Sequence, residues 1–281
     1  MTTYSDLLLP QLVDAVKRVE GVKAIVLGGS RARGTHTPSS DIDLGIYYHP
    51  DDPLNLDQLR ESAIRLDDEH RADVLTEPGG WGPWINGGGW LKVQSHPIDF
   101  LYKDLQKITG VIEDCLRGRV EMVYQPGHPF GFVSSIYLAE VALCQPLWDP
   151  NGTISELKSI IDPYPDPLQK ALIEKFAWEI DFSIQIAHKS IERADVAYAA
   201  GCCFRSAMCM LQVLFALNQT HWLNEKGAVA VADRFAVRPA RLQARLNESF
   251  QLLAADPHAI QKSIVILEEL RAEINTLIPE L

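Results

Sequence analysis

One stretch, residues 28–45 with the sequence GGSRARGTHTPSSDIDLG, constrains this chain more than any other. It follows a short apolar run, residues 22–27, whose β-branched side chains are typical of a buried strand. The Gly-Gly-Ser turn that ends at Ser30 breaks this strand. Backbone N–H groups exposed in such a turn, at Gly29 and its neighbours, can hold phosphate oxygens. The hydroxyl of Ser30 and the guanidinium of Arg33 add further donors.

Two carboxylates follow the turn at the start of a second predicted strand, residues 41–48. Asp41 and Asp43 are two residues apart, and side chains at this spacing point to the same face of a strand. Paired carboxylates on one face form a hard oxygen site that suits Mg²⁺ or Mn²⁺. With a bound triphosphate, such a site can support two-metal displacement at phosphorus. The alternative is a solvated strand face, which explains neither the Gly-Ser turn nor the spacing.

A third carboxylate, Asp99, lies in the apolar segment 96–102, which is predicted to be another strand. On a strand next to the first pair it would act as a metal ligand or as a general base toward an acceptor hydroxyl. The alternative is a carboxylate that pairs with a nearby Lys or Arg.

The Gly-Ser turn and the Asp-x-Asp pair that follows it after a gap of ten residues resemble the signature of the DNA polymerase β-like nucleotidyltransferase superfamily. The longer string in residues 28–45 is similar to that of small-molecule enzymes such as aminoglycoside and lincosamide nucleotidyltransferases. This resemblance implies that Asp41 and Asp43 bind Mg²⁺, as a pair of ions, and that Asp99 completes the metal site or activates the acceptor. It also implies that Gly29, Ser30 and Arg33 hold the nucleoside triphosphate, for which we expect ATP.

The first part of the chain alternates predicted helices and strands, which indicates an α/β (α+β) domain with a small mixed sheet. Residues 78–90 stand out because they hold six glycines and Trp81, Trp84 and Trp90. We interpret this segment as a wall for the acceptor, with a packed surface loop as the alternative. The other elements predicted here are helices at 5–19, 56–66 and 104–117 and a strand at 72–76.

From about residue 130 strand-like runs disappear, and five segments show helical periodicity: 132–145, 168–193, 196–217, 239–254 and 257–278. The sequence therefore predicts a catalytic domain at residues 1–126 and an all-helical bundle domain at residues 127–281. The bundle resembles the C-terminal half of antibiotic nucleotidyltransferases.

Three charged residues of the helical half are candidates for a functional role. Lys226, next to Gly227, would reach the triphosphate as a point charge or remain a solvated surface lysine. Arg205 lies in an otherwise apolar helix and needs a partner, either a phosphate or an acidic side chain. Glu140 is a second candidate for the general base, because some antibiotic nucleotidyltransferases use a glutamate from this half.

The composition limits the partners. The 281 residues contain 26 Lys plus Arg against 37 Asp plus Glu, and the net charge of -11 argues against a nucleic-acid template. Five cysteines without a Cys-x-x-Cys pair argue against disulfides and a zinc site. Without a signal peptide or an apolar run of membrane-spanning length, we expect a cytoplasmic protein with no membrane partner, while an oligomer stays open.

These observations lead to one expected function and two alternatives. The expected function is transfer of a nucleoside monophosphate, AMP from ATP, to a hydroxyl of a small molecule with release of pyrophosphate. An aminoglycoside-like antibiotic is one such acceptor. The first alternative is adenylylation of a protein, as in antitoxin-type enzymes. The second is a catalytically silent nucleotide-binding regulatory module.

Overall fold

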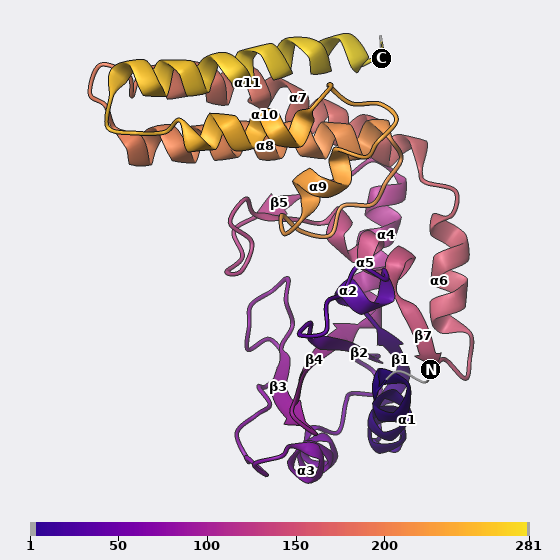
Figure 1. The fold of residues 1–281 in the computed structure, drawn as a ribbon. Helices are drawn as coiled ribbons and strands as arrows, with labels where there is room; N and C mark the ends of the chain where they lie inside the picture. The colour runs from indigo at the N-terminus through magenta and orange to yellow at the C-terminus, as the bar shows by residue number, and fades with distance from the viewer. Residues whose placement is uncertain (1–3, 280–281) are drawn as a thin grey trace. The chain divides into compact units, whose positions relative to one another are not determined.

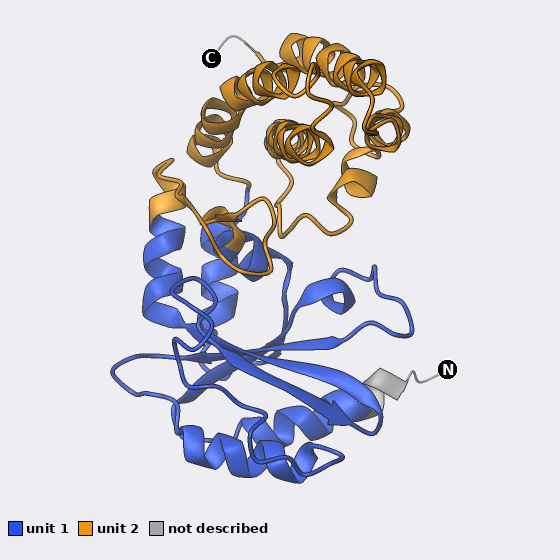
Figure 2. Ribbon diagram, turned by 90° about the vertical axis from the view of Figure 1, so that its left-hand side faces the viewer, with its two compact units in different colours: residues 1–113, 137–163 blue, residues 114–136, 164–281 orange. Residues whose placement is uncertain are grey.

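The computed structural model describes residues 4–279, which divide into two compact units (Figure 2). Unit 1 contains the residues up to 113 together with 137–163, and unit 2 contains residues 114–136 and 164–281. The chain thus passes from one unit to the other three times. The predicted boundary between residues 126 and 127 lies inside the short first segment of unit 2, and residues 137–163 return to unit 1.

Unit 1 is built on a five-stranded mixed sheet with the strand order β3-β4-β2-β1-β7. Strands β2 and β4 are parallel, and the other neighbours are antiparallel. This confirms the predicted fold class, a small mixed sheet with helices followed by a helical region. The strands are β1 (Val22–Leu27), β2 (Ile42–Tyr48), β3 (Gly88–Val93), β4 (His96–Asp104) and β7 (Gln145–Trp148).

One face of the sheet is closed by α1 (Tyr4–Val16) and α3 (Leu56–Leu66), which lie side by side against it (Figure 1). Alternate residues of β1, β2 and β4 enter this core, including the fully buried Ile25, Leu44 and Phe100. Pro10 lies inside α1. The remaining helices of unit 1 are α2 (Gly29–Ala32), α4 (Leu105–Leu116), α5 (Ser135–Leu143) and α6 (Thr153–Ile161).

The strand expected at 72–76 is wrong, and β3 forms instead in the glycine-rich segment. Only Leu75 makes an isolated bridge, to Gly89. The glycines of β3 are required by close backbone approach: a Cβ at Gly88 would overlap the Phe100 carbonyl, and one at Gly89 would overlap the Val74 carbonyl. Glycine here permits tight pairing and does not break the strand.

The expectation that strands end near residue 130 is also wrong. β7 pairs with β1 at the edge of the sheet, and β5 (Met122–Val123) pairs with β6 (Phe132–Val133) in unit 2. These three strands have only two to four residues, and β7 contains Pro146. None of them therefore has an alternating pattern long enough to be recognised as a strand in the sequence.

Unit 2 is a helical assembly around α7 (Asp166–His188) and α8 (Val196–Leu217), with α9 (Ala228–Ala232), α10 (Leu242–Gln251) and α11 (Pro257–Leu277). Within the described residues, α8 is long and apolar enough to cross a membrane, which the sequence reading overlooked. However, 67% of its apolar window is buried inside the protein. α7, α10 and α11 pack along it (Figure 1), so burial in a protein core accounts for its apolar character.

Candidate active site

The sheet brings two of the three predicted carboxylates, Asp43 and Asp99, into one row. Asp43 of β2 and Asp99 of β4 are direct partners in the parallel pair. The backbone N–H of Gly28, at the end of β1, donates to the Asp43 carbonyl at 2.8 Å. On the far side of Asp99, Trp90 of β3 is its antiparallel partner. Paired residues on neighbouring strands point to the same face, so both carboxylates and Trp90 project opposite the α1/α3 core.

The Gly-Ser turn is fitted against Asp43. Gly29 has φ +60, and a Cβ at this position would lie 2.6 Å from Asp43 Cγ and closer still to Oδ2. Only glycine allows both this backbone conformation and this approach. Ser30 is half-buried in the single turn of α2, and its carbonyl accepts the Thr35 N–H at 3.0 Å. The turn therefore sits directly beside one of the predicted metal ligands.

Asp41 lies just before β2 and is exposed, so it is not part of the strand on which the spacing placed it. Its backbone is held by Arg31, to which the sequence reading gave no role. The Arg31 guanidinium donates to the carbonyls of Ser40, at 2.6 Å, and Asp41, at 3.0 Å. Because Arg31 belongs to α2, it fixes the start of β2 to the Gly-Ser turn. The position of Arg31 within the loop between the Gly-Ser turn and Asp41 was the sequence signal that could have indicated this role.

Electrostatics show that the three carboxylates are close enough to interact. Burial, followed by the charges of Asp43 and Asp41, raises the pKa of Asp99 to about 7. Among the described residues, no group of three His, Cys, Asp or Glu is clustered tightly enough to hold a metal ion. The donor set nevertheless fits Mg²⁺, because a divalent cation would relieve the repulsion that disfavours ionised Asp99.

The other predicted phosphate ligand near the turn, Arg33, is exposed, and its Nε donates to the Gly29 carbonyl at 3.3 Å. Its guanidinium therefore lies next to the turn. Its role toward a triphosphate stays a prediction.

Glu140, the second candidate for the general base, lies elsewhere on the same face. Lys103 of β4 pairs with it at 2.7 Å. Lys103 is four residues beyond Asp99 on the strand, about 13 Å at the usual rise per residue. The Glu140 carboxylate is therefore engaged in an ion pair with Lys103, and which of the two carboxylates acts as the general base stays a prediction.

The two candidates from the helical half belong to unit 2. Arg205 forms a bidentate ion pair with Glu179, with Nη2 2.9 Å from Oε2, and donates to the Phe130 carbonyl at 3.0 Å. An acidic partner, one of the two alternatives that the sequence left open, thus accounts for an arginine among apolar residues. Lys226 is exposed before α9, and its contribution to triphosphate binding stays a prediction.

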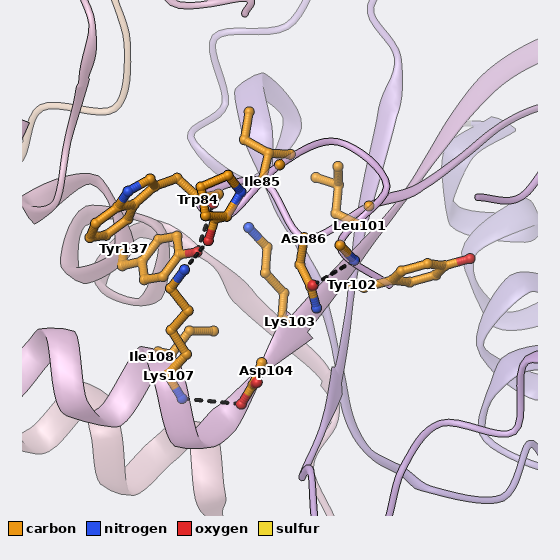
Figure 3. Close-up of a pocket in the computed structure, with 14 residues that line it drawn as sticks. Trp84, Ile85, Asn86, Leu101, Tyr102, Lys103, Asp104, Lys107, Ile108 and Tyr137 are labelled. Atoms are coloured by element: carbon orange, nitrogen blue, oxygen red, sulfur yellow. Dashed lines mark hydrogen bonds between the residues drawn. The ribbon is translucent and has the colours of Figure 1, made fainter. Parts of the chain in front are cut away.

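A cavity of about 260 Å³ lies beside β4 (Figure 3). Trp84, Tyr137 and the apolar Leu101 line it together with Lys103 and Lys107. The Tyr137 hydroxyl donates to the Trp84 carbonyl at 2.6 Å, and the Lys107 ammonium lies 4.6 Å from the Trp84 ring centroid. These contacts fasten the loop that carries the glycines to α4 and α5.

Asp99→Asn is expected to stabilise the protein above pH 7. The raised pKa means that the folded protein holds a proton that the unfolded chain releases near 3.8, so stability falls as pH rises from about 4 to about 7. Asparagine removes this dependence. Because part of the carboxyl faces solvent, screening reduces the gain to about 1–2 kcal/mol at pH 8.

Urea unfolding of the wild type and the variant at several pH values between 4 and 8 measures this difference. The gain should vanish near pH 4, and Mg²⁺ at pH 8 should narrow it by stabilising the wild type. Equal or lower stability of the variant at pH 8 would show that Asp99 is not held in a repulsive environment.

The candidate site thus consists of a Gly-Ser turn packed on a strand carboxylate and a second carboxylate on the adjacent parallel strand. Residues 9–81 match the family model described as nucleotidyltransferase domain. The N-terminal part of the chain is therefore a nucleotidyltransferase domain of the DNA polymerase β-like superfamily, and the sequence-based assignment is confirmed. The activity that this domain supports in general is nucleotidyl transfer.

Further comparisons extend beyond this domain. Residues 132–226 match the model of a domain of unknown function, DUF4037. The matched residues belong partly to unit 1 and partly to unit 2. The structure is similar to the crystal structure of a nucleotidyltransferase-like protein from Exiguobacterium sibiricum 255-15, with 10% identity and a TM-score of 0.42. The match covers 92% of this chain and 71% of that chain. No curated protein matches the sequence.

Proposed function

We propose that this protein transfers a nucleoside monophosphate, AMP from ATP, to a hydroxyl of a small molecule and releases pyrophosphate in the cytoplasm. The observation that carries the proposal is the row of Asp43 and Asp99 on neighbouring parallel strands beside the Gly29 turn. Asp41, Asp43 and Asp99 would hold Mg²⁺, which supplies charge neutralisation and orientation of the phosphates when bound. The Gly29-Ser30 turn and Arg33 would hold the β- and γ-phosphates.

The arrangement supports separate binding positions for the triphosphate and the acceptor along the row of carboxylates. The Gly-Ser turn lies on the β1 side of Asp43, so the triphosphate would bind there. Asp99 lies on the opposite side of Asp43, toward β3, and the acceptor would bind there. As a carboxylate next to the acceptor, Asp99 would accept the proton of the attacking hydroxyl.

The test is a transfer assay with the full-length protein, Mg²⁺, each of the four common nucleoside triphosphates labelled at the α-phosphate, and a panel of small hydroxyl compounds. We expect pyrophosphate release and a labelled small molecule with ATP. A labelled protein band after addition of cell lysate would show that the acceptor is a protein and not a small molecule. Binding of Mg²⁺ and ATP without pyrophosphate release across the panel would overturn the proposal in favour of a silent nucleotide-binding module.

A further inference from the structure

The three tryptophans of the Gly-rich segment have different structural roles. Trp84 anchors the loop through the Tyr137 and Lys107 contacts at the cavity (Figure 3). Trp81 and Trp90 instead stack on each other, with ring centroids 4.5 Å apart and an angle of 21° between the planes. The Trp90 side chain remains 60% exposed. Loop anchoring therefore accounts for Trp84 and leaves the stacked pair, with its half-buried Trp81 and exposed Trp90, unexplained.

An exposed indole forgoes much of the stabilisation that its burial would give. Trp90 is nevertheless held firmly, because its backbone is paired with Asp99 on one side and its N–H donates to the Val74 carbonyl at 3.3 Å on the other. Trp81 supports the ring from the preceding loop. The two nearly parallel indoles thus form a fixed flat surface in place of a mobile side chain.

The position of this surface ties it to the reaction. Residues directly opposite each other in an antiparallel pair have Cα atoms about 5 Å apart, so the Trp90 ring and the Asp99 carboxylate emerge side by side. The order across the sheet is then the Gly-Ser turn, Asp43, Asp99 and Trp90. The triphosphate would occupy one end of this row, and the stacked indoles lie at the other.

We infer that the Trp81–Trp90 pair is the acceptor subsite and that the acceptor is a hydroxyl compound with a planar aromatic ring. The ring stacks on the indole surface, and the hydroxyl lies about one strand spacing away, at Asp99. This inference rests on the proposed function, since it names the substrate class of the same site. Stacking would position the acceptor, while Asp99 would take the proton.

The experiment compares acceptors that are matched in their hydroxyls and differ in the ring: phenyl and methyl β-D-glucoside, and adenosine and methyl β-D-riboside. With the wild type we expect the aromatic member of a pair to bind more tightly and to have a KM at least about tenfold lower. Trp90→Ala should abolish this preference with little change in kcat, and Trp90→Phe should restore most of it.

Trp178→Ala provides the matched control, because Trp178 is 61% exposed on α7 of unit 2. This variant should keep the wild-type preference. Saturation-transfer NMR of the same probes measures binding without turnover, so the inference is tested even if no transfer occurs. It is overturned if no aromatic probe binds better than its partner, or if Trp90→Ala binds the aromatic probe like the wild type. Absence of pyrophosphate release with intact ring binding would instead overturn the proposed function and leave the indole pair as a binding site for aromatic rings.

Discussion

Asp43→Asn is expected to lower nucleotidyl transfer by at least about 10³-fold, equivalent to about 4 kcal/mol of transition-state stabilisation. Asparagine has the same shape and keeps the strand pairing to Asp99, but it lacks the charge that a divalent cation requires. The measurement is the rate of pyrophosphate release at saturating ATP and Mg²⁺, with the thermal unfolding midpoint as a check on folding.

The matched control is Asp51→Asn, which removes an exposed carboxylate after β2 in the same unit. Its rate should stay within about twofold of the wild type, because long-range effects of exposed charges are screened by salt. Retention of more than a tenth of the wild-type rate by Asp43→Asn would contradict a role for this carboxylate in the metal site.

Gly29→Ala is expected to reduce kcat/KM by at least about 10²-fold, because the new methyl group would displace the Asp43 carboxylate. It also places a side chain at φ +60, which costs about 1–2 kcal/mol of stability. Steady-state kinetics and urea unfolding measure the two effects separately.

Gly34→Ala is the control that separates the steric clash with Asp43 from the effect of backbone strain. Gly34 has φ +69, and a Cβ there meets no atom within 4 Å. This variant should lose similar stability and keep its activity within a few fold. If both variants lost activity equally, backbone strain in the loop, and not displacement of Asp43, would explain the effect.

The local part of the site was predictable because it depends on residues close in sequence. The turn at Gly29-Ser30 and the strand that carries Asp43 follow from a glycine break and apolar alternation within a single segment. The fit of Gly29 against Asp43 is a contact across one hairpin-like pair, and the motif spacing already implies it.

The non-local part could not be predicted in the same way. Asp99 meets Asp43 only because β4 lies next to β2 in the sheet order, with β3 beyond it. The sequence identified Asp99 as a candidate, but not the register that pairs it with Asp43. Trp90 was recognised as part of an unusual loop, but its strand was missed because close backbone packing selects glycines at Gly88 and Gly89.

The helical half shows the opposite balance. The helix at 196–217 was predicted with the bounds that α8 has, because its apolar residues extend over many turns. The partners of its polar residues were not predictable, since Glu179 lies on α7 and meets Arg205 only in the packed pair of helices. A buried charge signals that a partner exists and does not identify it.

The return of residues 137–163 to unit 1 has a consequence for engineering and for the exchange of parts between proteins. A fragment that stopped at residue 126 would lack β7 and leave β1 as an open edge of the sheet, a surface that invites aggregation. The helical unit is likewise made of two separate pieces of chain. A single cut therefore cannot separate either unit from the other. Transfer of one unit to another protein requires new junctions at all three points where the chain crosses between the units.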